Sequence, residues 1–310
     1  MDIIGPCLIN YITSGHAIIA PDTDQRAERK LLLQQYIIAT KGRLLLIMYD
    51  FHTHSAHSYD GFDTIEEICL RAIEIGLDGI ALTEHFDPEY LDDDTSIDLD
   101  KYWETVSEVS DRYSDRIYIA KGVELGLQPG HVMDECRQVA ASRPWDFVLA
   151  SIHVADGAAI DVDRFLAGRD ADDILHSYYK ALSVCLDEFD DFDVLAHINI
   201  IDRYIDLSGM SRAHMPMVAE ILQKAVDAGK GIEINTSSFR KGLGERTTPT
   251  QEMVDMYVSM GGEIITVGSD SHGSEHLGYK LDYALDMIRK AGLSHYATFH
   301  GRKPVFHRIS

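Results

Sequence analysis

The feature that most constrains the fold is a regular alternation of short apolar runs with longer amphipathic segments, which begins at Met48. Seven of the runs are brief, rich in apolar or β-branched residues and bounded by turn residues, as is typical of buried strands. They cover residues 49–52, 79–83, 117–124, 147–153, 194–197, 231–235 and 264–268. The sequence therefore predicts seven strands.

Segments with helical periodicity separate these strands. Residues 64–76 (TIEEICLRAIEIG) combine a capping residue, early acids, an apolar stripe and a terminal Gly, which together mark a complete helix. Similar segments cover 99–115, 131–142, 170–190, 211–229, 249–261 and 279–292. Because a helix follows each strand, we expect parallel βα units. The predicted fold is a closed or nearly closed α/β barrel, with a doubly wound open sheet as the alternative.

A chain of 310 residues is long for one ordinary domain, but α/β barrels reach this size as a single unit. Neither a Pro/Ser-rich linker nor an internal repeat divides it, so we predict one catalytic domain over residues 48–310. Residues 1–47 differ in charge balance from the rest. We interpret them as an N-terminal extension upstream of a natural start at Met48.

The charge of the chain limits its partners. Its formal net charge of -23 disfavours binding to nucleic acid, because the phosphate backbone is also negative. No apolar run is long enough to cross a membrane. The four cysteines are far apart and form no CxxC pair, which predicts reduced, mostly buried thiols in a cytoplasmic protein.

Side chains of the kind that bind metals recur at the carboxyl ends of the predicted strands. Six of the seven strands end in or run into a His, Asp or Glu. In a parallel barrel these ends form one rim, where active sites are built. The residues concerned are His52, His54, His85, Glu124, His153, His197, Asp270 and His272.

Spacing along the chain supports a shared metal site. His52 and His54 are two residues apart, and on an extended strand such side chains point to the same face. Imidazole and carboxylate donors without thiolate suit Zn²⁺, Mn²⁺ or Fe²⁺. The donors are too many for one tetrahedral ion, so we predict two or three divalent metal ions. Glu124 is the candidate bridge, since a carboxylate offers one oxygen to each of two cations.

Six short motifs together resemble the PHP (polymerase and histidinol phosphatase) superfamily, and most closely its histidinol-phosphatase branch. They are YDFHTHS at 49–55, ALTEH at 81–85, GVE at 122–124, SIH at 151–153, AH at 196–197 and GSDSH at 268–272. The resemblance extends over roughly residues 48–310. It implies a distorted seven-stranded (β/α)7 barrel that holds three metal ions.

The resemblance also implies how the ligands divide among three ions. The first set would be His52, His54, Glu124 and Asp270. The second would be Glu124, His153 and His197, and the third Asp60, His85 and His272. His57 lies near Asp60 in the sequence and is the alternative ligand in the third set.

Two arginines are predicted to bind the substrate. Arg203 and Arg240 follow the fifth and sixth strands, so their loops open on the same rim as the metal ligands. A planar guanidinium matches phosphate oxygens bidentately, and the resemblance implies that such arginines hold a substrate phosphate. Lys241 is a weaker candidate. Glu124, Asp270 and His272 are the residues predicted to take part in catalysis.

The implied activity is metal-dependent hydrolysis of a small phosphate monoester. The resemblance points to a histidinol-phosphatase of histidine biosynthesis, which acts on L-histidinol phosphate. The alternative is a PHP phosphoesterase of broad or different small-phosphate specificity, because specificity lies in the loops. The charge argues against a nuclease, and a non-catalytic metal-binding module would be expected to have lost several ligands. No oligomeric state is predicted.

Overall fold

The computed structural model describes residues 47–309, except 91–94, 96, 207–211, 242 and 245. Apart from Ile47, the predicted extension over residues 1–47 lies outside the described part of the chain. The interpretation of Met48 as the natural start therefore stays a prediction.

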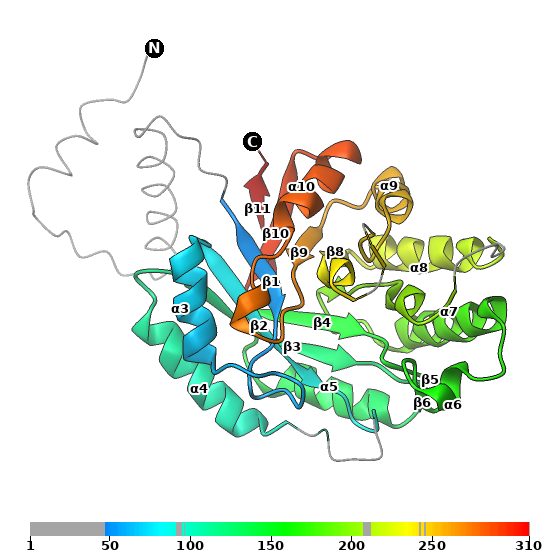
Figure 1. Ribbon diagram of the computed structural model, residues 1–310, viewed down its shortest axis with the longest axis horizontal. Coiled ribbons are helices and arrows are strands. Elements are labelled where there is room, and N and C mark those ends of the chain that lie inside the picture. Colours follow the sequence, from blue (N-terminus) through cyan, green and yellow to red (C-terminus); the bar gives the residue numbers. More distant parts are fainter. Residues whose placement is uncertain are drawn as a thin grey trace, which may run out of the picture. The chain divides into compact units, whose positions relative to one another are not determined.

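The seven predicted strands form one parallel sheet (Figure 1). Its order is β1-β2-β3-β4-β7-β8-β9, so strands that follow one another in this series are also neighbours in space. Such an order is typical of a barrel. The strands are β1 (Tyr49–Thr53), β2 (Gly79–Phe86), β3 (Tyr118–Gly126), β4 (Phe147–Ser151), β7 (Val194–Leu195), β8 (Gly231–Asn235) and β9 (Ile265–Gly268).

The first and last strands of the series meet and nearly close the barrel. The backbone N–H of Asp270 donates to the carbonyl of His52 at 2.9 Å, and that of His54 donates to Ser271 at 2.8 Å. These contacts lie just beyond the carboxyl end of β9. The predicted distorted seven-stranded barrel is confirmed, and the doubly wound alternative is wrong.

Every predicted helix is present and covers the outside of the barrel in Figure 1. The first of them shows why the sequence folds this way. Thr64 accepts from the backbone of Glu67, the Glu67 side chain accepts from Thr64, and Gly76 ends the helix at φ 81°. The helices are α3 (Ile65–Ile75), α4 (Leu99–Arg112), α5 (Val132–Ser142), α7 (Ala171–Glu188), α8 (Met215–Asp227), α9 (Gln251–Ser259) and α10 (Leu281–Lys290).

Two antiparallel hairpins were not predicted. One pairs β5 (Val154–Ala155) with β6 (Ala158–Ala159), just after β4. The other pairs β10 (His295–His300) with β11 (Lys303–Arg308) and lies across the amino ends of the strands. Short elements complete the description: α6 (Asp163–Leu166), η1 (Ile200–Arg203), η2 (Ser237–Phe239) and η3 (Ser274–His276).

Aromatic side chains close the amino end of the barrel. Phe147 contacts Phe51 and Phe299, with ring centroids 5.0 Å apart in each pair. All three rings are buried. The interior is therefore apolar at this end, which leaves the carboxyl end as the place where polar groups gather.

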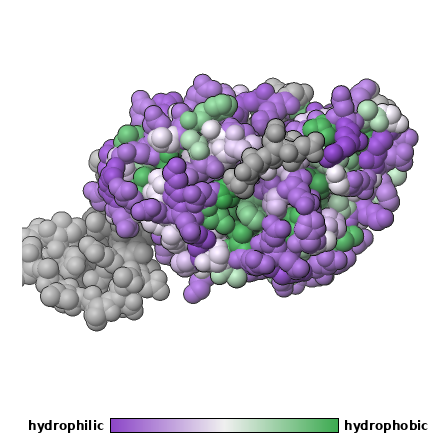
Figure 2. Space-filling model, turned by 90° about the horizontal axis from the view of Figure 1, so that it is seen from below, coloured by the Kyte–Doolittle hydropathy of each residue, from purple (hydrophilic) through white to green (hydrophobic). Residues whose placement is uncertain are grey.

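The outer surface is mostly hydrophilic on the face shown in Figure 2, with apolar residues gathered near its middle. Among the described helices, none is long and apolar enough to pass through a membrane. Cys69, Cys136 and Cys185 are buried and free, as predicted, while Cys7 lies outside the described residues.

Candidate metal centre

The two histidines of β1 point to the same place, as their spacing predicts. The Nε2 atoms of His52 and His54 are 3.0 Å apart. Both face the carboxylates of Glu124 and Asp270. Nε2 of His54 lies 3.5 Å from a carboxylate oxygen of each acid. Nε2 of His52 lies 3.2 Å from Glu124 and 3.8 Å from Asp270. The first predicted ligand set is therefore assembled.

Glu124 stands at the middle of the centre and is fully buried. Its Oε2 atom faces the β1 histidines and also lies 3.1 Å from Nδ1 of His85. Its Oε1 atom lies 2.9 Å from Nε2 of His197 and 3.6 Å from Nε2 of His153. The two oxygens thus face different groups of histidines, which is the geometry that a bridging carboxylate needs.

The third predicted set lies on the other side of His54. The ring of His54 stacks against those of His85 and His272, with centroids 4.1 and 4.4 Å away. Asp60 reaches both of these histidines, with Oδ2 3.0 Å from His272 and Oδ1 3.7 Å from His85. His57 instead lies against Tyr102. The structure therefore brings Asp60 rather than His57 to this cluster.

Asp270 has a backbone conformation that is uncommon for a residue other than glycine. Its φ is 52°, in the left-handed region, which Asp tolerates better than most residues. Its side chain accepts from Ser237 at 2.8 Å and lies 3.5 Å from His54. The turn after β9 is thus held in a conformation that aims the carboxylate at β1.

Two buried acids that the sequence reasoning did not assign fix the orientation of ligand histidines. Glu233 accepts from Nδ1 of His52 at 2.7 Å, and Asp87 lies 2.9 Å from Nδ1 of His153. With the proton on Nδ1, the lone pair of each ring lies on Nε2, which faces Glu124. Such pairs hold metal-binding histidines in the required tautomer.

Glycines make room for both orienting acids. A Cβ atom at Gly126 would lie 1.7 Å from Oδ1 of Asp87. A Cβ atom at Gly268 would lie 2.3 Å from Oε1 of Glu233 and 2.4 Å from Cβ of His52. Any larger residue at these two strand ends would displace a side chain that positions a ligand.

Electrostatics at the centre favour positive charge next to Glu124. Burial alone would raise the pKa of this carboxyl, but His52, His85 and His153 outweigh burial and hold it well below its usual value. Burial works against a charged His52, yet Glu233, Glu124 and Asp270 raise its pKa well above the ordinary value. Burial and the neighbouring His85 and His272 lower the pKa of His54. A neutral imidazole there has a lone pair to donate.

These residues are suited to divalent metal ions. Four overlapping groups of three donors have their ligand atoms within 4.8 Å of one another. Metal bonds of about 2.0–2.2 Å in a tetrahedron would place donor atoms roughly 3.4 Å apart, which is inside this limit. With Nδ1 of His52 donating to Glu233, its Nε2 faces Nε2 of His54 and Oε2 of Glu124, so a metal ion bound there would take the place of a proton between these atoms. The groups are His54, His85, His272; His52, Glu124, His197; His52, His54, Asp270; and His85, Glu124, His153.

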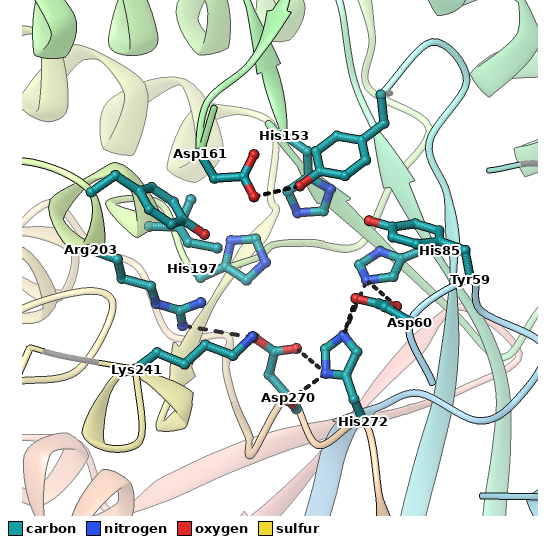
Figure 3. A pocket seen from close by; sticks show the side chains of 13 residues that line it. Tyr59, Asp60, His85, His153, Asp161, His197, Arg203, Lys241, Asp270 and His272 are labelled. Atoms are coloured by element: carbon teal, nitrogen blue, oxygen red, sulfur yellow. Dashed lines mark hydrogen bonds and ion pairs between the residues drawn. The ribbon is translucent and has the colours of Figure 1, made fainter. Parts of the chain in front are cut away.

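A cavity of about 130 Å³ opens beside the centre (Figure 3). Several ligand candidates line it together with two cations and a group of tyrosines. The lining residues are Tyr59, Asp60, His85, Tyr90, His153, Asp161, His197, Ile200, Arg203, Tyr204, Lys241, Asp270 and His272.

The predicted substrate-binding arginines occupy different places. Arg203 lines the cavity, and its Nη2 lies 3.8 Å from Asp270. Arg240 turns its Nη2 to the backbone carbonyl of Ser269 at 2.6 Å and is not among the lining residues. Lys241 lines the cavity instead. A substrate contact for Arg240 stays a prediction.

Comparison with known proteins identifies the family. The PHP domain model matches residues 50–237. A histidinol-phosphatase from Lactococcus lactis is 29% identical over 258 residues, which are 82% of this chain and 95% of that protein. A protein from Clostridium acetobutylicum named "Probable histidinol-phosphatase" is 29% identical over 265 residues, which are 84% of this chain and 96% of that protein.

A solved structure has the same fold and a related sequence. It is the histidinol phosphate phosphatase of Lactococcus lactis in complex with zinc, L-histidinol and phosphate. The TM-score is 0.75 at 26% identity, and the match covers 84% of this chain and all of that one. The family match spans more than half of the sequence and includes β1 to β8, which carry most of the predicted ligands. The chain therefore belongs to the PHP family.

Proposed function

We propose that this protein is a metal-dependent histidinol-phosphatase, which hydrolyses L-histidinol phosphate to L-histidinol and inorganic phosphate. The observation that carries the proposal is the convergence of nine His, Asp and Glu side chains, with Glu124 among them, beside a cavity that also contains Arg203 and Lys241. The names of the relatives from Lactococcus and Clostridium support L-histidinol phosphate as the substrate.

The ligands would hold two or three divalent ions of the zinc, manganese or iron type. Such ions supply Lewis-acid stabilisation of phosphoryl oxygens and make a nearby water molecule more acidic. We assign His52, His54, Glu124 and Asp270 to the first ion. We assign Glu124, His153 and His197 to the second, and Asp60, His85 and His272 to the third.

Arg203 is placed to bind the phosphoryl group. Its Nε donates to Ser238 at 3.1 Å and its Nη2 to Asn235 at 3.4 Å, so the guanidinium is fixed before a substrate enters. A preorganised cation next to developing negative charge stabilises the transition state of phosphoryl transfer. Lys241 adds a second positive charge on the same side of the cavity (Figure 3).

Steady-state kinetics on L-histidinol phosphate and on a panel of sugar phosphates tests the proposal. We expect kcat/KM for L-histidinol phosphate to exceed that for every sugar phosphate, and chelation of the ions to abolish turnover. Equal efficiency on all substrates would favour a broad phosphoesterase. Activity that persists after complete removal of metal would contradict the mechanism.

We also propose a cytoplasmic location. Three buried free thiols, those of Cys69, Cys136 and Cys185, are suited to a reducing compartment. Fractionation of cells with an antibody to the protein would test this, and recovery outside the cytoplasmic fraction would refute it.

A further inference from the structure

One carboxylate that lines the cavity has no part in the metal centre. Asp161 follows β6 and accepts a hydrogen bond from the hydroxyl of Tyr90 at 2.9 Å. Asp60 and Asp270, the other lining acids, are engaged by His272 and His54. Within the described part of the chain, no Lys or Arg forms an ion pair with Asp161. Its negative charge is therefore available to a ligand.

The tyrosine that holds Asp161 is itself held against the metal centre. The ring of Tyr90 lies 6.2 Å from that of His153 and 5.6 Å from that of Tyr59. Tyr59 in turn stacks on His85 at 5.3 Å. Asp161 is thus connected to the ligand histidines through aromatic contacts, which place its carboxylate at the wall of the reaction cavity.

Asp161 and the two lining cations occupy different parts of this cavity. In Figure 3, His197 lies between Asp161 on one side and Arg203 and Lys241 on the other. A substrate phosphate belongs with the cations and the metal ligands. A positive group on the alcohol part of the substrate would be repelled there and attracted to Asp161.

We propose that Asp161, positioned by Tyr90, binds the ammonium group of the substrate and makes the enzyme selective for phosphorylated amino alcohols. This inference rests on the proposed histidinol-phosphatase function and identifies the residue that binds the substrate ammonium group. Asp161 is a specificity residue that contacts substrate, and Tyr90 is a positioning residue that acts through it.

The test compares two substrates that differ only in the amine. These are L-histidinol phosphate and 3-(imidazol-4-yl)propyl phosphate, which keeps the imidazole and the phosphate ester. We expect Asp161→Asn to reduce the ratio of their kcat/KM values by about 10- to 100-fold, as loss of a hydrogen bond to a charged group does. The change should arise from a higher KM for L-histidinol phosphate. Tyr90→Phe should reduce the ratio less.

Asp163→Asn is the matched control, because Asp163 is exposed, lies two residues further along and does not line the cavity. It should leave the ratio unchanged. A ratio that Asp161→Asn does not alter would overturn the inference, as would equal losses on both substrates. Thermal unfolding of the variant identifies a loss caused by misfolding. If the unaltered protein fails to hydrolyse L-histidinol phosphate, the proposed function itself is refuted, which is a different result from an unchanged ratio.

Discussion

The two ends of the barrel hold their buried acids in different ways. At the amino end, Asp193 accepts from the backbone of Val148 at 2.8 Å and from Nε of Arg302 at 2.6 Å. At the carboxyl end, Glu124 is surrounded by imidazoles. At the amino end, groups of the protein itself therefore supply the hydrogen bonds and the positive charge that the buried acid needs. At the carboxyl end, Glu124 and the lone pairs of several histidines are instead available to a bound cation. Stability and catalysis should respond separately to changes at the two ends.

The largest effect is expected from Glu124→Gln. The amide cannot offer two anionic oxygens to the histidine groups on either side, so ions should bind weakly and turnover should fall by about 1,000-fold or more, or ~4 kcal/mol. Kinetics and elemental analysis of the purified variant measure both effects. A variant with full metal content and full activity would show that the carboxyl end does not depend on cations.

His307, at the amino end, should make stability depend on pH. Its ring lies between Tyr49 and Tyr296 and contacts Thr298, and burial lowers its pKa to about 4. In the unfolded chain the pKa of this histidine is near 6.5. The buried neutral ring therefore makes its full contribution to the free energy of unfolding above pH 6.5. This contribution is lost as pH falls toward 4, by about 3 kcal/mol.

His307→Phe keeps a ring in place but removes the titration. Denaturant unfolding from pH 7 to pH 4 should show a shallower loss of stability than in the unaltered protein. Parallel curves for the two proteins would contradict the assignment. Carboxyl groups that titrate in the same range contribute equally to both curves.

Arg203→Gln tests whether a change at the carboxyl end affects catalysis more than stability. Its side chain is 2% exposed and lies near Asp270. Loss of this cation should reduce kcat/KM by about 100-fold, since one fixed donor to the transferred group contributes about this much. The free energy of unfolding should change far less. A rise in KM with unchanged kcat would instead assign Arg203 to ground-state binding.

The smallest effect is expected from Arg302→Gln, the matched change at the amino end. Asp193 keeps its backbone donor but loses the guanidinium, so stability should fall by about 1–2 kcal/mol. Because the site is at the other end of the strands, kcat and metal content should stay unchanged. A loss of metal in this variant would show that the two ends are coupled.

The sequence predicted the barrel well because its strands are buried on both faces. Continuous apolar runs such as Phe147–Ser151 are therefore visible without any alternation. The β10–β11 hairpin was missed for the opposite reason. One of its strands, Lys303–Arg308, is largely exposed and mixes charged with apolar residues, so its pairing is determined by the barrel that it covers.

The candidate ligands were predictable because they recur at strand ends, but their supporting acids were not. Asp87 lies beyond the predicted end of β2, which in the structure continues to Phe86. Glu233 lies inside β8, the one strand of the series that was not predicted to contribute a metal ligand. A charged residue within a buried strand needs a partner, and that rule could have identified Glu233. The place of Arg240 depends on a turn whose backbone contacts no sequence pattern encodes.

The contact that nearly closes the barrel has a consequence for biosynthesis of the protein. Asp270 reaches its position through a hydrogen bond to His52, a residue made more than two hundred positions earlier. A growing chain cannot complete the proposed first ion set until its final barrel strand has emerged and docked. Uptake of the full complement of ions is therefore a late event, and the loaded protein is one whose chain has already closed on itself.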